Sequence, residues 1–268
     1  MNIRHWPLVP LTYVGFLLLP IYWLITMAFK PEFEITRQLT FWSQHPTLDN
    51  FVTVLTERDW WMGYVNAGIY VVMNVVISVG VAIPAAYAFS RGDFPLKKPL
   101  FFSFLVFRLI APVILVVPFT EIFYDLGLFD THIAVAMAHC YFNLPVAVWI
   151  LEGAISAVPL EVDQSSFVDG HSLLGFFRRL LIPTIAPSIA VTAFFCFMFS
   201  WVEYVLAGAL TAVNAKPING IISRIGDITE GDYGMLAAVS ILGFVPGLIF
   251  MLMVRRHLIQ GFSLGRVR

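Results

Sequence analysis

Charged residues and cysteines are scarce in this 268-residue chain. Only 12% of its residues are Asp, Glu, Lys or Arg, its formal net charge is −1, and 59% are hydrophobic. Soluble domains usually carry about 25% charged residues, and disordered chains are poor in apolar ones, so the composition excludes both classes. It also provides no basic surface for nucleic acid. The two cysteines, Cys140 and Cys196, lack the spacing of a metal or redox motif, and we expect no metal site.

The sequence also lacks the motifs of ATP binding and of metal or redox catalysis. No Lys follows a Gly, so the chain lacks the G-K step of a phosphate-binding Walker A loop. The metal-site and redox motifs H-E-x-x-H and C-x-x-C are also missing. We therefore predict that the chain is not an enzyme, and that any ATP that drives its activity binds to another subunit.

Long stretches without any charged residue separate the clusters of charge. Five of them cover residues 5–29, 60–90, 131–151, 180–202 and 233–254, and a sixth, 100–119, contains only Arg108. Each reaches the roughly 18 to 20 residues that cross about 30 Å of hydrocarbon as an α-helix. We predict an all-α, polytopic membrane protein in which residues 1–268 form a single transmembrane domain with six helices.

The positions of Lys and Arg predict the orientation, since these residues are enriched in cytoplasmic loops. The side that carries both termini has ten of them: Arg4, Arg91, Lys97, Lys98, Arg178, Arg179, Arg255, Arg256, Arg266 and Arg268. The other side has five: Lys30, Arg37, Arg58, Lys216 and Arg224. Both termini are therefore expected in the cytoplasm.

One internal connection, residues 156–185, has the pattern of a folded element. Pro159 suits the first turn of a helix, where its missing N–H would have no partner anyway. Glu161 and Asp163 would then lie near the positive end of that helix, which favours negative charge. We predict a short helix over residues 160–168.

A turn and a second helix are expected to follow. Asp169 and Gly170 end the first helix, because Gly readily adopts the left-handed conformation that helix ends require. A second helix is expected over residues 172–181, with several apolar side chains and two arginines near its end. Such a helix-turn-helix could lie on the lipid surface or dock onto a partner.

The same segment carries a family resemblance. Residues 159–170 read P-L-E-V-D-Q-S-S-F-V-D-G, and L-I-P follows at 181–183. This pattern resembles the EAA motif of the membrane subunits of binding-protein-dependent ABC importers. Four further segments are similar to the maltose-type carbohydrate branch: G-L-F-D-T at 127–131, N-L-P at 143–145 with Trp149, W-V-E-Y-V-L-A at 201–207 with Leu210 and Thr211, and Q-G-F-S-L-G-R-V-R at 260–268. The chain departs from the family at 164–166, where Q-S-S replaces E-A-A, and at Val202, where the branch has Asn.

The resemblance implies a type I ABC importer permease in the bacterial inner membrane. It implies that residues 156–185 dock on a cytoplasmic ATPase and couple it to the membrane helices through Glu161, Asp163, Gln164, Ser165, Asp169 and Gly170. The tail is a second expected ATPase contact, through Gln260, Gly261 and Gly265. The implied partners are a homologous second permease, two ATPase copies that hold ATP and Mg²⁺, and an external solute-binding protein, while this chain itself would hold no cofactor.

Polar side chains inside the expected spans mark a candidate solute path. Ionisable groups at membrane depth are costly and usually face a bundle interior or an aqueous cavity. Steps of three, four and seven residues return to one helical face, which groups His139 with Asn143 and Ser200 with Glu203. The full candidate set is Asn74, Arg108, His139, Asn143, Ser200, Trp201, Glu203 and Tyr204. These residues could line a translocation path or form hydrogen bonds between helices.

We predict the transmembrane subunit of an ATP-driven importer for a sugar, a polyol or a related small solute, working by alternating access. The solute itself is not specified, although Arg108 hints at a phosphorylated polyol. The main alternative is a stand-alone secondary transporter that couples protons through Glu203, His139 or Arg108, and an uncoupled channel is a second rival. Ion-coupled transporters often have repeated halves, and we see no clear internal repeat.

Overall fold

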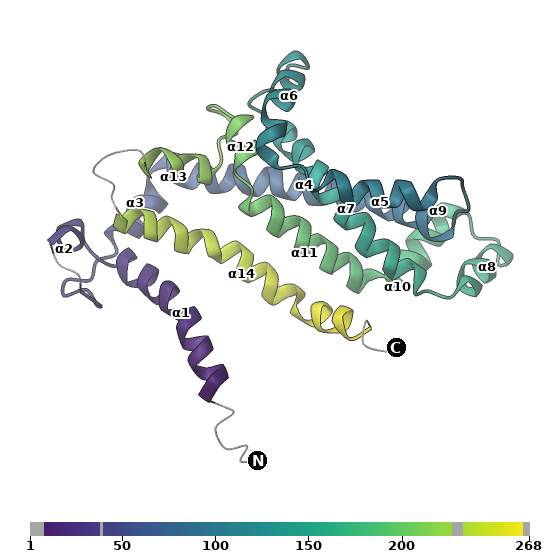
Figure 1. Ribbon diagram of the computed structural model, residues 1–268, viewed down its shortest axis with the longest axis horizontal. Coiled ribbons are helices and arrows are strands. Elements are labelled where there is room, and N and C mark those ends of the chain that lie inside the picture. Colours follow the sequence, from purple (N-terminus) through teal and green to yellow (C-terminus); the bar gives the residue numbers. More distant parts are fainter. Residues whose placement is uncertain (1–7, 38–39, 227–232, 265–268) are drawn as a thin grey trace. The chain divides into compact units, whose positions relative to one another are not determined.

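The computed structural model describes residues 8–37, 40–226 and 233–264, and every regular element in these ranges is a helix (Figure 1). In chain order the elements are α1 (Leu8–Ala28), α2 (Glu32–Arg37), α3 (Asp49–Thr56), α4 (Arg58–Arg91), α5 (Lys97–Phe107), α6 (Pro112–Asp125), α7 (His132–Ser156), α8 (Leu160–Val168), α9 (Leu173–Phe176), the π-helical turn η2 (Phe177–Leu181), α10 (Ile182–Thr184), α11 (Ala186–Val202), α12 (Val205–Ala209), α13 (Ile218–Gly226) and α14 (Tyr233–Leu264). The all-α class predicted from the sequence is confirmed.

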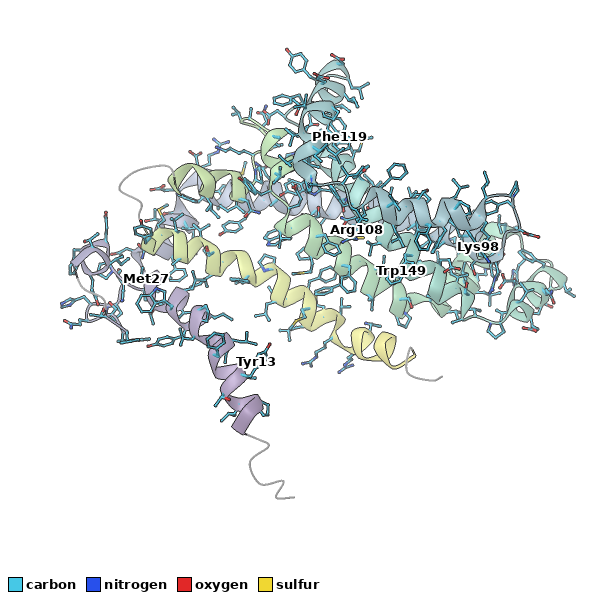
Figure 2. All side chains as sticks on the ribbon, in the orientation of Figure 1. Tyr13, Met27, Lys98, Arg108, Phe119 and Trp149 are labelled. Carbon is cyan, nitrogen blue, oxygen red and sulfur yellow. The ribbon has the colours of Figure 1, made fainter. Side chains whose placement is uncertain are left out.

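Four of these helices, α1, α4, α7 and α14, are each long and apolar enough to cross a membrane. Two bent pairs reach the same length and hydropathy only when each pair is taken together: α5 with α6, and the segment Leu173–Thr184 with α11. Counting each bent pair as one span gives the six spans that the sequence predicts. The apolar character continues around α1, where side chains such as Tyr13 project into the surroundings (Figure 2), as expected of a helix that faces lipid.

The third expected span, residues 100–119, is not one continuous helix. α5 ends at Phe107, α6 begins at Pro112, and their axes differ by 96°. Pro112 has no N–H to donate and disfavours a helical backbone in the preceding residue. Ala111 is accordingly extended, with φ −63° and ψ 137°. The expectation of an unbroken helix is wrong here, and Arg108 lies at the break as the C-terminal cap of α5.

The fifth expected span, residues 180–202, begins later than predicted. α11 covers residues 186–202 and is bent by 80° from the segment that precedes it. Ile185 lies between them with φ −95° and ψ 11°, outside the helical range. Pro187 follows in the first turn of α11, where its missing N–H is tolerated. The internal connection therefore meets α11 at a bend and is not a straight extension of it.

The chain forms two compact units, and the first consists of Met1–Tyr64 and Ile218–Pro246. Its helices pack around a small apolar core of Val54, Trp60, Ile218 and Val239. The hydroxyl group of Tyr64, at the end of this unit's part of α4, donates a 2.6 Å hydrogen bond to the carbonyl oxygen of Val239 in α14.

A carboxylate organises the connection between α2 and α3. Glu34 accepts hydrogen bonds from the hydroxyl groups of Ser43 (2.7 Å) and Thr40 (3.1 Å) and from the backbone N–H groups of Gln44 (2.9 Å) and His45 (3.4 Å). Burial alone would raise the pKa of Glu34, but these hydrogen bonds outweigh it and lower the pKa to about 2. The ionised side chain therefore holds this connection at neutral pH.

The second unit consists of Val65–Pro217 and Gly247–Arg268. One part of its core includes Ala82, Ile83, Leu151, Ile155, Phe176 and Leu181. A second part includes Tyr70, Val71, Phe123, Val135, Leu206 and Leu210. Because Phe176 and Leu181 belong to α9 and η2, the internal connection shares a core with the long helices α4 and α7.

Candidate functional site

The internal connection of residues 156–185 is called the coupling loop below, after the role that the family resemblance implies, and it folds much as its sequence predicts. Pro159 precedes α8, whose first turn carries Glu161 and Asp163. The helix ends at Val168, and Gly170 has a φ of +79°, which favours glycine. The limits of α8 and the left-handed conformation at Gly170 are confirmed.

The second half of the coupling loop differs from the single helix expected over residues 172–181. Ser172 caps α9 by accepting a 3.2 Å hydrogen bond from the N–H of Gly175. After Phe176 the chain widens into the π-helical turn η2. Pro183, two residues after the end of η2, has no N–H to donate to the preceding turn. π-helical turns interrupt α-helices at positions where the backbone hydrogen bonding is irregular in this way.

The predicted coupling residues do not share one surface of α8. Glu161, Gln164 and Ser165 are exposed, as are Asp169 and Gly170 beyond the helix. Asp163 is only 3% exposed and Ser166 only 1%. The exposed residues are free to contact another chain, whereas Asp163 faces the interior of its own unit.

Asp163 is bound by two side chains from the last turns of α4. Its Oδ2 accepts hydrogen bonds from Arg91 Nε at 3.0 Å and from the hydroxyl group of Tyr87 at 3.2 Å. Arg91 Nη2 lies 3.4 Å from Asp163 Oδ1 and donates a 2.7 Å hydrogen bond to the carbonyl oxygen of Val158. The ion pair is nearly buried, with 14% of the Arg91 side chain and 4% of the Asp163 side chain exposed.

Aromatic rings surround this ion pair. Phe176 is fully buried, and its ring centroid lies 5.8 Å from that of Tyr87, 5.4 Å from that of Phe167 and 6.0 Å from that of Phe177. The rings of Tyr87 and Phe177 are 5.0 Å apart. The coupling loop is therefore joined to α4 by both polar and aromatic contacts.

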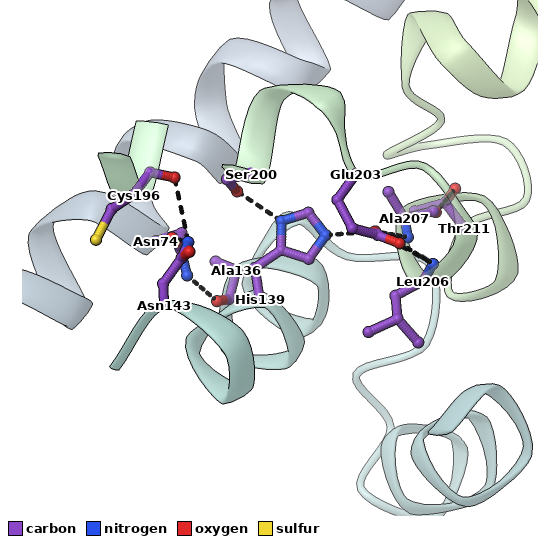
Figure 3. A network of polar contacts seen from close by, with 10 residues as sticks. All are labelled: Asn74, Ala136, His139, Asn143, Cys196, Ser200, Glu203, Leu206, Ala207 and Thr211. Atoms are coloured by element: carbon purple, nitrogen blue, oxygen red, sulfur yellow. Dashed lines mark hydrogen bonds and ion pairs between the residues drawn. The ribbon is translucent and has the colours of Figure 1, made fainter. Parts of the chain in front are cut away.

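A second polar cluster lies between α7 and α11 (Figure 3). His139 Nε2 lies 2.9 Å from Glu203 Oε2, and His139 Nδ1 forms a hydrogen bond with the hydroxyl group of Ser200. The carboxylate of Glu203 also accepts hydrogen bonds from the backbone N–H groups of Leu206 (3.0 Å) and Ala207 (3.3 Å). Glu203 therefore binds α7 and caps the start of α12 at the same time.

Asn74 of α4 extends the cluster to a third helix. Its Nδ2 donates a 2.9 Å hydrogen bond to the carbonyl oxygen of Ala136, and its Oδ1 accepts one from Asn143 Nδ2. Asn143 Nδ2 also donates to the carbonyl oxygen of Cys196 in α11 at 3.1 Å. The two polar stripes predicted from residue spacing thus lie against each other, and the hydrogen bonds described here run between helices.

The remaining candidates for the solute path lie in different surroundings. The guanidinium of Arg108 is 4.3 Å from the ring centroid of Phe199, and its Nη1 is 3.5 Å from the carbonyl oxygen of Phe142. Trp201 stacks on Phe197 with a centroid distance of 5.7 Å, and Tyr204 is 47% exposed. The structure therefore brings together Asn74, His139, Asn143, Ser200 and Glu203, and it gives Arg108, Trp201 and Tyr204 aromatic or exposed settings.

The C-terminal candidates are largely outside the described part of the chain. Gln260 and Gly261 fall in the last turns of α14, but their surroundings are not described, and Gly265 lies outside the described residues altogether. Their expected ATPase contact stays a prediction.

Sequence reasoning missed Tyr87, Arg91 and Asp130. Tyr87 and Arg91 are four residues apart and so share one face of α4, a spacing that could have been matched to the acidic first turn of α8. Asp130 has a φ of 60° and donates its N–H to the carbonyl oxygen of Leu210 at 3.0 Å. Its carboxylate accepts hydrogen bonds from the backbone N–H groups of Ala212, Val213, Asn214 and Ala215, at 2.9 to 3.2 Å.

These contacts determine the charge of Asp130. Partial burial favours the neutral acid, but the backbone N–H groups of Asn214, Ala212, Ala215 and Val213 outweigh it and hold the pKa of Asp130 below its ordinary value. The ionised carboxylate therefore ties the connection between α6 and α7 to the one between α12 and α13.

Known proteins share both the sequence pattern and this helical architecture. Residues 60–260 match the family described as "Binding-protein-dependent transport system inner membrane component". The chain belongs to this family. The permease is thus an inner-membrane component of a binding-protein-dependent transport system.

Individual relatives cover almost the full length of the permease. The trehalose transport system permease protein SugB of Mycobacterium tuberculosis (strain CDC 1551 / Oshkosh) is 28% identical, over 98% of this chain and 97% of its own. The diacetylchitobiose uptake system permease protein DasC of Streptomyces coelicolor is 25% identical, over 99% and 97%. These similarities favour the importer over the stand-alone proton-coupled transporter.

Solved structures show the same fold. A chain of a bacterial ABC transporter involved in the import of the acidic polysaccharide alginate superimposes with a TM-score of 0.76 at 20% identity, over 94% of the permease and 96% of that chain. The permease therefore has the overall fold of a transporter chain. Within that fold its third span is broken and a bend precedes α11.

Proposed function

We propose that the permease is one of two homologous membrane subunits of an ATP-driven importer for a sugar, a polyol or a related small solute. Two copies of a cytoplasmic ATPase would hold ATP and Mg²⁺, and an external solute-binding protein would deliver the solute. Both termini would then lie in the cytoplasm, in agreement with the excess of Lys and Arg on their side. Residues 1–268 would act as one transmembrane domain with the coupling loop inside it.

The observation that carries this proposal is the folded coupling loop. α8 exposes Glu161, Gln164 and Ser165, and α9 exposes the apolar side chains of Leu173 and Leu174. A helix that lies on lipid usually has Lys and Arg on its polar face, and the cytoplasmic leaflet is negatively charged. α8 has acidic residues and no basic one, which favours a protein partner over a lipid surface.

Alternating access connects this loop to transport. Closure of the ATPase dimer on ATP would move the coupling loop, and the helices joined to it would turn to open the solute path outward. Gln164, where relatives of the EAA type have Glu, would still offer the ATPase a hydrogen-bonding side chain.

For the solute path, the structure supports different roles for the candidate residues. The close contacts of Asn74, His139, Asn143, Ser200 and Glu203 with one another support interhelical hydrogen bonding. Tyr204 is exposed and Arg108 and Trp201 are partly exposed, and we propose that these three are the candidates in this chain that contact solute. A saccharide needs hydrogen-bonding groups beside aromatic walls, and these three residues offer both.

Transport by the reconstituted complex tests the proposal. The permease would be purified with its second permease and ATPase, placed in lipid vesicles with the binding protein outside, and supplied with radiolabelled trehalose, diacetylchitobiose or a polyol. We expect uptake of at least one of these solutes that requires ATP on the side of the ATPase and stops when the ATPase is removed. Uptake that needs only a proton gradient would contradict the proposal.

A further inference from the structure

We propose that Asp163, Arg91 and Tyr87 form a latch that fixes α8 to α4, so that movement of the coupling loop passes directly into α4. This inference rests on the proposed function, because it assumes that an ATPase moves the loop. It gives Asp163 a positioning role inside the permease in place of the ATPase contact that the family resemblance implies.

The first support is the geometry of the latch. Arg91 uses Nε and Nη2 on the two oxygens of Asp163, at 3.0 and 3.4 Å, while the same Nη2 binds the carbonyl oxygen of Val158 at 2.7 Å. Tyr87 adds a hydrogen bond to Asp163 Oδ2 at 3.2 Å. A guanidinium that binds a carboxylate through two nitrogens restricts orientation as well as distance. The last turn of α4 therefore holds both the residue before Pro159 and the first turn of α8.

The second support is burial. Only 3% of Asp163 is exposed, so it is not available to another chain while the latch is formed. Exposed residues on the same helix, Glu161 and Gln164, are available. α8 therefore has an outer face for a partner and an inner face that is bound to α4.

The third support is the path from the latch into the membrane helices. α4 runs without a break from Arg58 to Arg91, across Pro84. Near the latch, Ser90 Oγ lies 2.8 Å from Ser156 Oγ of α7. About 25 Å further along α4, at 1.5 Å per residue, Asn74 forms the hydrogen bonds with α7 that lead to the cluster of His139 and Glu203. Because α4 carries both contacts, a displacement of α8 would be transmitted along α4 to the polar cluster.

Substitutions in the full reconstituted importer test the latch. We expect Asp163→Asn and Arg91→Gln to lower the number of solute molecules taken up per ATP hydrolysed about fivefold or more, the lower range of measured couplings between sites. The amount of ATPase that copurifies should stay at the wild-type level. Exchange of the two charges, Asp163→Arg with Arg91→Asp, should recover most of the uptake per ATP, and Tyr87→Phe should lower it least because the ring contacts remain.

Asp93→Asn is the matched control, since it removes an exposed carboxylate two residues beyond Arg91. It should leave both the amount of bound ATPase and the uptake per ATP unchanged. An unchanged ratio in Asp163→Asn would overturn the inference, and so would a charge exchange that folds and binds the ATPase but recovers nothing. If the wild-type complex itself shows no ATP-dependent uptake, the proposed function fails first, which separates the two failures.

A second measurement leaves the ion pair between Asp163 and Arg91 intact, so it tests the inference even if the variants above do not fold. Spin labels at Leu160→Cys in α8 and Ala88→Cys in α4 occupy exposed positions, and the two native cysteines are buried. If α8 and α4 move together, the distance between the labels should be the same with and without ATP and Mg²⁺ in the full complex. A change of more than about one helical turn, ~5.4 Å, would show that the two helices move independently and would overturn the inference.

Discussion

Two aspartates flank α7, and they hold their segments by different means. Asp130, before the helix, accepts hydrogen bonds from four consecutive backbone N–H groups. Asp163, after the helix, binds the side chains of Arg91 and Tyr87. Every residue except proline has a backbone N–H, so the binding of Asp130 depends little on which side chains the loop carries, and Asp130 fixes the course of the loop. A side-chain pair depends on two particular residues, so Asp163 fixes the position of one helix against another.

The difference separates a local anchor from a connection that can carry movement. Glu34 is of the same kind as Asp130, because it binds backbone N–H groups and hydroxyl groups of its own connection. Both carboxylates shape a turn. Asp163 joins two helices whose paired side chains are 72 residues apart in the sequence. Among the contacts between described residues, it is the only one of these three carboxylates that binds a charged side chain.

The largest loss of stability is expected from Asp163→Ala. This change leaves the nearly buried Arg91 cation without its carboxylate, and removal of one partner of a buried pair costs about 3 to 5 kcal/mol. Thermal unfolding of the purified permease in detergent would measure the loss. The double substitution Asp163→Ala with Arg91→Ala should be no less stable than Asp163→Ala alone, because it leaves no unpaired charge. Additive losses would argue that the two residues do not act as a pair.

A smaller loss is expected from Asp130→Ala. The four backbone N–H groups lose their acceptor, but the site is only half-buried, so water can replace part of it, and we expect about 2 kcal/mol. Limited proteolysis should then cut within residues 210–217 more rapidly than in the wild type. Asp130→Asn is the matched control, since its side-chain oxygen keeps part of the hydrogen bonding. Equal cutting of all three proteins would contradict the anchoring role.

Gly170→Ala should have a smaller effect still. The φ of +79° at this residue is unfavourable for any residue with a Cβ, but a Cβ built there meets nothing within 4 Å. The cost is therefore backbone strain alone, about 1 to 2 kcal/mol, and the same unfolding measurement would detect it. Gly175→Ala, whose Cβ would meet Ser172 Oγ at 3.3 Å without a positive φ, is the control for loss of a glycine in the same loop. A larger loss from Gly175→Ala would show that side-chain contacts, and not conformation, limit this loop.

Local rules gave much of the fold and of the coupling loop in advance. Residues 160–168 were delimited by a proline, an acidic first turn and a glycine, all of which act through the nearest turns of backbone. Charge-free runs predicted where the spans lie, since hydrophobicity is summed over a whole segment. The helical repeat also placed His139 and Asn143 on one face, and Ser200 and Glu203 on another.

Contacts between distant segments were beyond these rules. Nothing local to Asp163 indicates that Arg91 is its partner, and the spacing rule could not tell whether the two polar faces line a path or bind each other. The break at Arg108 was missed because the apolar run continues across it, while the backbone there is governed by Pro112. Asp130 was missed because its partners are backbone groups, which have no signature in the sequence.

The smallest effect expected is a difference in pH dependence between the wild type and Asp130→Asn. The folded-state pKa of Asp130 is lowered, so the carboxylate contributes stability above the unfolded-state pKa of about 3.9, and this contribution is lost as the pH falls through the lower, folded-state pKa. The difference in unfolding temperature between the two proteins should therefore be constant from pH 7 to about pH 5 and should shrink below about pH 4. Glu34→Gln should show the same form, with its loss spread from the ordinary pKa of 4.5 down to about 2. If the difference in unfolding temperature between the wild type and Asp130→Asn grew as the pH fell, the loop would bind the neutral acid in preference to the carboxylate. The contrast between the two aspartates would then have to be explained without a charged anchor at Asp130.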